Sequence, residues 1–453
     1  MFEKLADFLD RKLSTPMAKM SEQRHLRAVR DGIVATLPII IVASMFMVVA
    51  FLPDSLPNDW AFVQWIAKYQ DKILLPYRVS MYIMTLYAVF GIGHSLAKSY
   101  QLDPLSGGIL AELAYLLTIV PTMVPEVPES VTQLAKSNPE LAEYIGQVPL
   151  GFQLPMANLG AKGMFIGILT AILAVEIYRM TERSGFKISM PEQVPASIAR
   201  SFESLTPTAI ILFIVAAITM WLEVDVHEMM TTLVTPLVSA SDSLVSVLLL
   251  TFLNSFFWVF GIHGASIVGS LARPIWLMLF DGNTEALAAG ATIPHVAAEP
   301  FYQWFIYIGG AGATIGLALA LLITKSEYGK TLGKTTIIPA IFNINEPLIF
   351  GAPIVLNPVL MIPFIVAPIV NALIAWFATS MGLINRVVAL PAWTLPGPIG
   401  AFLATGADWR AAVLSIILIL LSTAIYYPFV KLYDKKLLLE EQGEEVVEEA
   451  KER

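Results

Sequence analysis

Long apolar runs separated by short polar segments are the main pattern of this chain. Runs of about 20 apolar residues, the length a helix needs to cross the hydrocarbon core of a bilayer, recur along its 453 residues. This periodicity is typical of membrane-spanning helices. We therefore predict an all-α integral membrane protein with about ten transmembrane helices. These spans cover residues 32–52, 79–98, 105–124, 161–180, 205–222, 243–262, a short 264–280, 302–324, 353–381 and 410–430.

Two further apolar stretches do not fit simple spans. Residues 334–353 read KTTIIPAIFNINEPLIFGAP, and residues 390–404 read LPAWTLPGPIGAFLA. Proline and glycine at this density break helices, and non-helical backbone is tolerated at membrane depth only where protein buries it or a cavity lies beside it. Both stretches are therefore predicted to form re-entrant hairpins. Interrupted segments of this kind point to the substrate site of a transporter.

The first residues, FEKLADFLDRKLSTPMAKM, place apolar side chains at helical spacing beside basic ones. This pattern predicts an amphipathic helix on the membrane surface. Residues 190–206 have a similar character and are expected to connect two halves of the protein. No cleavable signal peptide is expected, since the polar start is followed by a full-length span.

The distribution of charge predicts an orientation in the membrane. Short cytoplasmic loops carry an excess of Lys and Arg. The loop 125–149 has four glutamates and one lysine, so it is expected outside, and both termini are expected in the cytoplasm. The basic residues on the inner side are Lys4, Arg11, Lys12, Lys19, Arg24, Arg27, Arg30, Arg179, Arg183, Lys187, Arg200, Lys325, Lys330, Lys334, Lys431, Lys435 and Lys436.

Composition supports the membrane assignment. Hydrophobic residues make up 56% of the chain and charged residues only 14%, against about 25% charged in soluble domains. The net charge of −8 comes largely from the tail 440–453, which is predicted to be a solvated helix or disordered, so no nucleic-acid partner is expected. The absence of cysteine excludes disulfides, thiolate metal sites and a cysteine nucleophile.

Glu346 is the first candidate for chemistry, because an ionisable group inside an apolar segment is costly and marks a functional site by default. Asn343 and Asn345 beside it supply the donors and acceptors that a sugar hydroxyl needs. The alternative is a helix-capping or ion-paired carboxylate with a structural role.

His263 lies in the run FFWVFGIHGAS between two glycines, at the end of an apolar span. Imidazole can hydrogen-bond a hydroxyl group or accept its proton, although a histidine bound to a backbone carbonyl is also compatible with this pattern. Asn254 and Trp258 precede it. An aromatic face can pack against a sugar ring, but tryptophan is also common at membrane interfaces.

Five other positions remain open. Trp393 is an aromatic candidate because its segment is predicted to be re-entrant. Asn158 and Lys162 open the fourth span and either reach a substrate or extend to the interface. His295 and Glu299 have i, i+4 spacing, but no third ligand is evident; we expect a polar contact rather than a metal site. No metal or cofactor is expected.

The run GGAGATIGLALALL, from Gly309 onward, has small residues at close intervals. This pattern predicts close helix packing. The run lacks the Lys and Ser or Thr of a nucleotide-binding phosphate loop, so an ATP-driven pump is not expected.

Five runs together carry a family resemblance: VPASIARSF, FFWVFGIHGA, GGAGATIGL, FNINEPLIFGAPIVLNPVLMIPF and PAWTLPGPIGAF. They resemble the IIC permeases of the bacterial phosphotransferase system, in the lactose, cellobiose and N,N'-diacetylchitobiose family. The resemblance covers most of the chain. It implies a homodimer of ten-span protomers in the cytoplasmic membrane, with a transport domain that moves as an elevator. The glutamate of the NEP run and the histidine of the GIHG run, here Glu346 and His263, are implied to lie beside the sugar hydroxyl that receives phosphate.

The resemblance also implies partners. A phosphorylated IIB protein, itself supplied by IIA, donates the phosphoryl group from a cysteine; since this chain has no cysteine, IIB is expected to be a separate polypeptide. The substrate is expected to be a disaccharide of the cellobiose or chitobiose type. The alternative is an ion-coupled sugar transporter without phosphorylation, and a less favoured rival is an intramembrane metalloenzyme. Expected domains are an N-terminal helix and scaffold (1–189), connectors and the fifth span (190–242), the sugar-binding transport domain (243–430) and a charged cytoplasmic tail (431–453).

Overall fold

The computed structural model describes residues 23–452, except 55, 58, 149, 192, 196–201, 353 and 356, and only the backbone of residues 443–452. The predicted N-terminal amphipathic helix and part of the connector 190–206 lie outside the described residues. The described chain divides into two compact units. One contains residues 31–35 and 82–232, and the other contains residues 36–81 and 233 onward together with the described residues up to 30.

The unit of residues 82–232 is a helical bundle. Its core is formed by α5 (Met84–Ser99), α6 (Pro104–Leu116) and α9 (Met164–Ser184), which pack on one another. Glycine allows α5 and α6 to approach closely, since a Cβ on Gly93 would lie 2.5 Å from the carbonyl oxygen of Gly107. The remaining elements are β1 (Thr122–Val124), α7 (Glu129–Ala135), α8 (Pro139–Gln147), β2 (Gly151–Gln153), η3 (Ala161–Gly163), α11 (Leu205–Ala216) and η4 (Ala217–Trp221).

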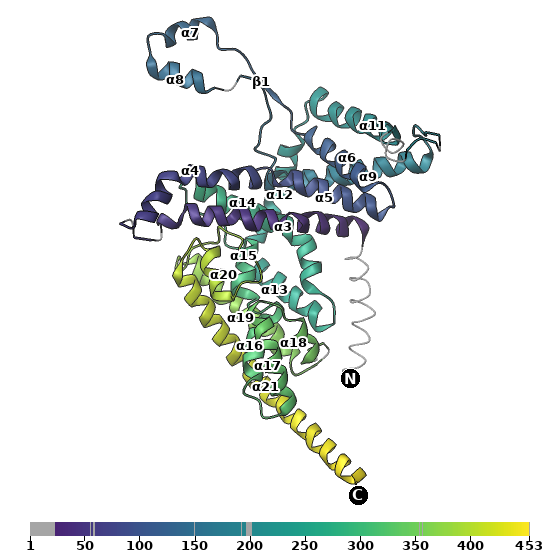
Figure 1. Cartoon of the computed structure of the whole chain (residues 1–453), viewed down its shortest axis with the longest axis vertical. Helices are drawn as coiled ribbons and strands as arrows, with labels where there is room; N and C mark the ends of the chain where they lie inside the picture. Colours follow the sequence, from purple (N-terminus) through teal and green to yellow (C-terminus); the bar gives the residue numbers. More distant parts are fainter. Residues whose placement is uncertain are drawn as a thin grey trace. The chain divides into compact units, whose positions relative to one another are not determined.

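The strands β1 and β2 form a short antiparallel ribbon in which Met123 pairs with Phe152. Figure 1 shows that the ribbon leads to α7 and α8, which lie side by side beyond it. These elements make up the loop 125–149 that was predicted from its glutamates to lie outside the membrane.

The other unit is built around broken helices. Its elements are α4 (Ala61–Met81), α13 (Leu244–Val259), α14 (Gly264–Ala288), α15 (Glu299–Phe301), η5 (Tyr302–Ile306), η6 (Ala311–Ala313), α16 (Ile315–Leu321), α17 (Glu327–Ile341), α18 (Glu346–Gly351), α19 (Met361–Ser380), α20 (Gly397–Ala404) and α21 (Trp409–Glu452). Helix α3 (Arg24–Ala50), with the η2 turn (Leu52–Asp54) after it, and helix α12 (Val226–Ser241) complete the chain, and α3 and α12 contribute residues to both units.

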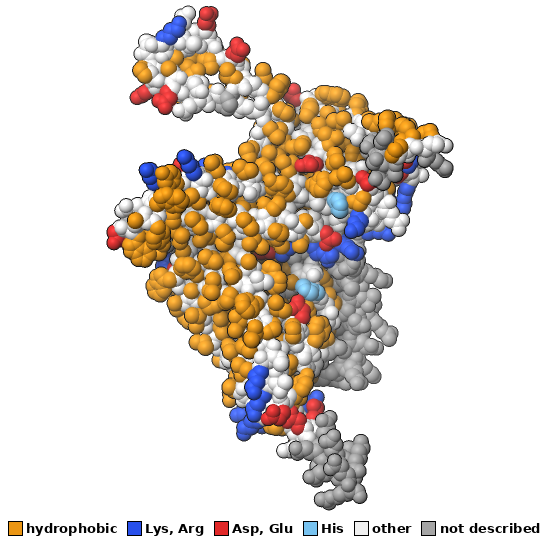
Figure 2. Space-filling model, viewed as in Figure 1, with side chains coloured by type: hydrophobic (Ala, Val, Ile, Leu, Met, Phe, Trp, Pro, Cys, Tyr) orange, Lys and Arg blue, Asp and Glu red, His pale blue; other side chains and the backbone are white. Residues whose placement is uncertain are grey.

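The core of this unit lies between α16, α19, α21 and the α17–α18 pair (Figure 1). Gly316 in α16 faces the backbone of α21, where an added Cβ would lie 2.6 Å from the carbonyl carbon of Ser422. The predicted close helix packing is therefore present at Gly316. On the opposite side of α21, side chains such as Ile417 and Leu420 are exposed, and hydrophobic side chains cover much of the surface in Figure 2. Such a surface suits lipid.

The helices confirm a helical membrane protein. Five described helices are long and apolar enough to cross a membrane, and up to seven if each of two bent pairs counts as one span. Helices α3, α9, α13, α19 and α21 lie on predicted spans. The predicted total of ten stays a prediction.

Several boundaries differ from the prediction for physical reasons. The span predicted at 302–324 is broken, and its two parts meet at 53°, because Gly309, Gly310 and Gly312 have positive φ. The helix predicted over 105–124 ends at Leu116, and β1 follows. Helix α4 was not predicted at all, since the polar run KYQDK interrupts its apolar pattern.

Candidate functional site

A cavity of about 370 Å³ lies within the unit of residues 36–81 and 233–453. This volume is in the range of small-molecule binding sites. Three interrupted segments contribute to its wall: the break between α17 and α18, the glycine break before α16, and the segment before α20. Non-helical backbone at membrane depth is expected beside a cavity. The wall includes Asn254, Trp258, His263, Arg273, Glu299, Gln303, Trp304, Tyr307, Asn343, Asn345, Glu346 and Trp393, with Leu37 and Ile41 of α3.

Asn343 holds three loops together at this cavity. Its φ of 61° reverses the chain after α17. Its Oδ1 accepts the N–H of Gly309 at 2.8 Å, and its Nδ2 donates to the carbonyl oxygens of Trp393 (2.7 Å) and Leu395 (2.9 Å). Both amide N–H groups are thus used within the protein. The geometry makes Asn343 a residue that positions the site.

Asn345 has a similar position. Its Nδ2 donates to the carbonyl oxygen of Ala311 at 2.8 Å and to the hydroxyl of Thr314 at 3.1 Å. Gly310 packs directly on this amide, because a Cβ there would lie 2.4 Å from the Asn345 Cγ. The two asparagines therefore fasten the α17–α18 break to the glycine break before α16.

Glu346 is the first residue of α18 and is exposed to the cavity. Its carboxylate forms no hydrogen bond or ion pair with any residue that the structure describes. It lines the same cavity as His263. A carboxylate in this position can accept a proton or a hydrogen bond from a ligand.

His263 caps the N-terminus of α14. Its Nδ1 accepts the backbone N–H of Ser266 at 3.1 Å, so Nδ1 carries no proton in this arrangement. Neutral imidazole has one N–H, which therefore lies on Nε2 and makes the ring a hydrogen-bond donor. The ring lies against Trp258, with 4.5 Å between centroids.

The position of His263 depends on Gly264. A Cβ at Gly264 would lie 2.0 Å from the backbone oxygen of Asn254, so the start of α14 cannot stay in place when a side chain is added. We expect Gly264→Ala to weaken ligand binding by about tenfold or more, because overpacking shifts backbone. Equilibrium binding of the ligand to purified protein measures this change.

Gly269 provides the matched control on the same helix, since a Cβ there meets no atom within 4 Å. Gly269→Ala should leave binding unchanged. Equal binding by the Gly264→Ala variant and its Gly269→Ala control would contradict the role assigned to Gly264.

An ion pair lies in the cavity wall. Arg273 Nη2 is 2.8 Å from Glu299 Oε1, and the two side chains are 23% and 14% exposed. The sequence prediction missed Arg273, although an arginine within the predicted span 264–280 was a signal for a functional group. For Glu299 a polar contact was expected rather than a metal site, and its partner is Arg273.

Five polar atoms of the wall are buried without a hydrogen-bond partner among the described residues. They are Asn254 Oδ1, Trp258 Nε1, Arg273 Nε, Glu299 Oε2 and Tyr307 Oη. Buried polar atoms are normally hydrogen-bonded.

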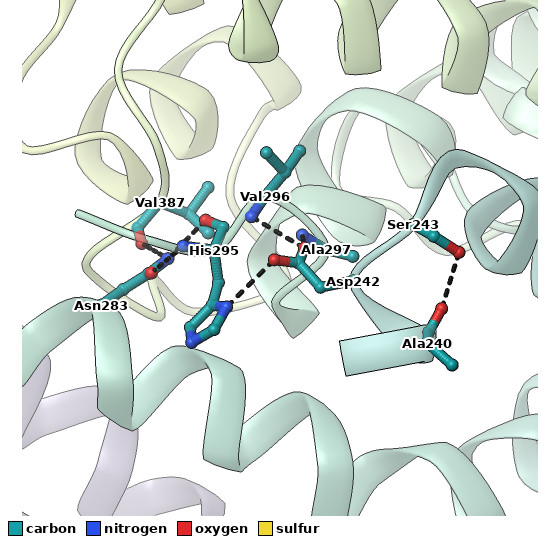
Figure 3. Close-up of polar contacts among 8 residues, drawn as sticks. All are labelled: Ala240, Asp242, Ser243, Asn283, His295, Val296, Ala297 and Val387. Atoms are coloured by element: carbon teal, nitrogen blue, oxygen red, sulfur yellow. Dashed lines mark hydrogen bonds and ion pairs between the residues drawn. The ribbon is translucent and has the colours of Figure 1, made fainter. Parts of the chain in front are cut away.

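His295 takes part in a separate polar cluster (Figure 3). Its Nδ1 lies 3.0 Å from Asp242 Oδ2, while the next two backbone N–H groups donate to Asp242 Oδ1 at 3.0 and 2.8 Å. Asn283 accepts the His295 N–H at 2.8 Å and donates to the carbonyl oxygens of His295 and Val387. The expected polar contact of His295 is thus present, with Asp242 as its partner.

This cluster separates His295 from Glu299, which pairs with Arg273. Among the described residues, no three ligand-type side chains gather closely enough to hold a metal ion. The cluster instead fastens the loop before α15 to α14 and to the segment before α20.

The structure brings seven of the nine predicted site residues to one cavity. They are Asn254, Trp258, His263, Asn343, Asn345, Glu346 and Trp393. The other two belong to the unit of residues 82–232: the backbone oxygen of Asn158 accepts the hydroxyl of Tyr115, and Lys162 lies in η3.

The fold defines a helical membrane protein with a cavity inside one of its two units. The family model for the phosphotransferase system EIIC matches residues 30–368. The cellobiose-specific EIIC component of Geobacillus stearothermophilus is 36% identical over 440 residues, which are 95% of this chain and 94% of that protein. The lichenan permease IIC component of Bacillus subtilis is 34% identical over 453 residues, 98% of this chain and 97% of that protein.

The solved structure of ChbC is also similar. ChbC is the IIC component of the N,N'-diacetylchitobiose-specific phosphotransferase system. It superimposes with a TM-score of 0.83 at 34% identity, covering 96% of this chain and 99% of that one. The chain belongs to the EIIC family of the phosphotransferase system.

Proposed function

We propose that this protein carries a β-linked disaccharide of the cellobiose or chitobiose type across the cytoplasmic membrane and presents it for phosphorylation by a separate IIB protein. The observation that carries the proposal is the exposed carboxylate of Glu346, which has no hydrogen-bond or ion-pair partner among the described residues and lines the same cavity as His263. The names of the cellobiose-specific relative and of the chitobiose-specific structure support this substrate class.

The cavity wall supports a sugar as ligand. Trp393 is 51% exposed and offers a flat apolar face, which suits the apolar face of a pyranose ring. The exposed carboxylate of Glu346 offers an acceptor to its hydroxyl groups, and the amide of Gln303 in the same wall offers a donor and an acceptor. A neutral disaccharide matches this mixture of aromatic and polar groups.

Glu346 is proposed as the base of the phosphoryl transfer. The hydroxyl oxygen of the sugar forms a bond to phosphorus as the phosphorus–sulfur bond to the IIB cysteine breaks. The hydroxyl proton goes to the Glu346 carboxylate, and the cysteine leaves as thiolate. His263 is not the base, because its Nδ1 already accepts the Ser266 N–H and its other ring nitrogen, Nε2, carries the proton of the neutral ring. The Nε2 N–H is therefore a hydrogen-bond donor.

The product is trapped by its charge. A sugar phosphate carries about two negative charges, which makes its return through an apolar path far more costly than the entry of a neutral sugar. We propose an elevator-like movement of the sugar-binding unit within a homodimer of ten-span protomers, with IIA supplying phosphate to IIB.

Uptake into membrane vesicles tests the function. Vesicles containing the protein should accumulate disaccharide phosphate from labelled cellobiose or diacetylchitobiose only when phosphorylated IIA and IIB are present. Accumulation of unmodified sugar without them, and its collapse with a proton uncoupler, would instead establish the ion-coupled alternative.

The proposed orientation can be measured because the chain has no cysteine. Tyr144→Cys in α8, which is 70% exposed, should react with an impermeant maleimide on intact cells. Lys436→Cys, whose parent side chain is 72% exposed, should react only after permeabilisation. The cysteine-free parent gives the background, and the reverse pattern would invert the proposed orientation.

A further inference from the structure

A second cavity, of about 200 Å³, lies between the end of α16 and helix α21. It is separate from the sugar cavity, since the two share no lining residue. One part of its wall is apolar and includes Ala320, Ile323 and Val430. The other part carries the side chains of Lys325, Lys431, Asp434 and Lys435.

The sequence of α21 places this cavity at a membrane surface. Residues 411–430 contain no charge and follow Arg410, and Lys431 comes directly after them. Twenty helical residues span about 30 Å, the thickness of the hydrocarbon core. Tyr427, which also lines the cavity, suits the interface because its ring is apolar and its hydroxyl polar.

The charges of the cavity do not balance. Within the described part of the chain, Lys325, Lys431 and Lys435 form no ion pair through their ammonium groups. The carboxylate of Asp434 is already engaged. It accepts the backbone N–H groups of Lys325 and Ser326, each at 2.9 Å, and the Ser326 hydroxyl at 2.6 Å.

We propose that this cavity binds one anionic phospholipid, with its phosphate held by the three lysines and an acyl chain lying along Ile323 and Val430. Ile323 is 64% exposed, so the apolar part of the site continues onto the lipid-facing surface. Basic pockets between helices at the membrane surface bind acidic headgroups. The adjoining apolar wall favours a lipid over a free phosphate ion.

The site has a structural consequence. Asp434 accepts the backbone N–H of Ser326, the N-cap residue of α17, and Glu441, about two turns further along α21, accepts the N–H of Tyr328 at 3.0 Å. Helix α17 leads directly to Asn343 and Glu346. A lipid between α16 and α21 therefore stabilises the attachment of the hairpin that carries Glu346.

Native mass spectrometry of the purified full-length protein tests the proposal. Titration with dioleoyl phosphatidylglycerol should show one lipid bound at least tenfold more tightly than dioleoyl phosphatidylcholine. Since a lysine near an acidic headgroup contributes about fivefold in affinity, the double variant Lys431→Gln/Lys435→Gln should bind phosphatidylglycerol about 30-fold more weakly.

Lys436→Gln is the matched control. Lys436 is on the same helix but does not line the cavity, and its ammonium lies 3.6 Å from Glu440. Phosphatidylglycerol binding by this variant should stay within about twofold of the parent. Monodisperse gel filtration and an unchanged melting temperature show that the double variant is folded.

Three results would overturn the proposal. Equal binding of the two lipids would remove the headgroup site, and displacement of phosphatidylglycerol by millimolar inorganic phosphate would indicate a free-anion site. If the double variant keeps its lipid affinity but loses phosphorylation by phosphorylated IIB, these lysines belong to a protein contact instead. The lipid measurement needs no sugar, so it can fail or succeed independently of the proposed transport function.

Discussion

Replacing Glu346 by glutamine is expected to lower the rate of sugar phosphorylation by about 10²–10⁴-fold, the contribution of a general base. Glutamine keeps the size and the carbonyl oxygen of the side chain but cannot accept the hydroxyl proton. Sugar affinity should therefore change by less than about tenfold. Single-turnover transfer from phosphorylated IIB measures the rate, and equilibrium binding measures the affinity.

Glu327→Gln is the control for this experiment. Glu327 begins α17 as Glu346 begins α18, but its side chain is 84% exposed, and among the described residues its ion-pair partner is Lys330 at 3.7 Å. Its variant should transfer phosphate at the parent rate. An undiminished rate in Glu346→Gln would show that another group accepts the proton, and a complete loss of binding would assign Glu346 to sugar affinity alone.

Replacing Arg273 by methionine is the second large expected effect. Methionine fills similar space but leaves Glu299, which is 14% exposed, without its cation. Removing one partner of a buried ion pair costs up to about 3–5 kcal/mol, and the water that a cavity admits reduces this value. We expect sugar affinity to fall by about 30-fold, or about 2 kcal/mol.

The double variant Arg273→Met/Glu299→Gln shows whether sugar affinity depends on the ion pair or on each side chain separately. If the stranded carboxylate is the main cost, neutralising it should restore part of the affinity, and the two single effects should not add. Additive losses in the four-membered cycle, measured by equilibrium binding, would show that the two side chains act independently on the sugar.

Continuous apolar helices could be predicted from the sequence because their periodicity is a local property. Helices α3, α9 and α13 lie where a 20-residue apolar run predicts them. Helix α4 has no such run, because its middle is polar; tertiary packing stabilises it. The predicted span 302–324 failed for the opposite reason. Its composition is largely apolar, and the break lies where Gly309, Gly310, Gly312 and Ala313 have positive φ.

The sequence predicted which residues form the candidate site better than it predicted their hydrogen-bond partners. Glu346 and His263 were identified because polar residues inside apolar segments are costly. The same argument should have identified Arg273. The sequence could not show which partner each polar group has. Both amide N–H groups of Asn343 donate to backbone oxygens of another loop, and those acceptors lie 50 and 52 residues further along the chain.

His295 illustrates the same limit. Its spacing to Glu299 is a helical one, yet the two residues lie on either side of the start of α15 and have different partners. Asp242, the partner of His295, is 53 residues away in the sequence. No local pattern predicts such a pairing.

The three hydrogen bonds of the Asn343 side chain can form only at certain stages of the protein's synthesis. They join residues 309, 343, 393 and 395, so the last of them can form only after about 90 further residues have followed Gly309 from the ribosome. At about 5–20 residues per second, that interval is on the order of ten seconds. Arg273 and Glu299 can pair early in this period, whereas the loops around Glu346 must wait for the segment before α20. The cavity around Glu346 is thus among the last parts of the nascent chain to be completed.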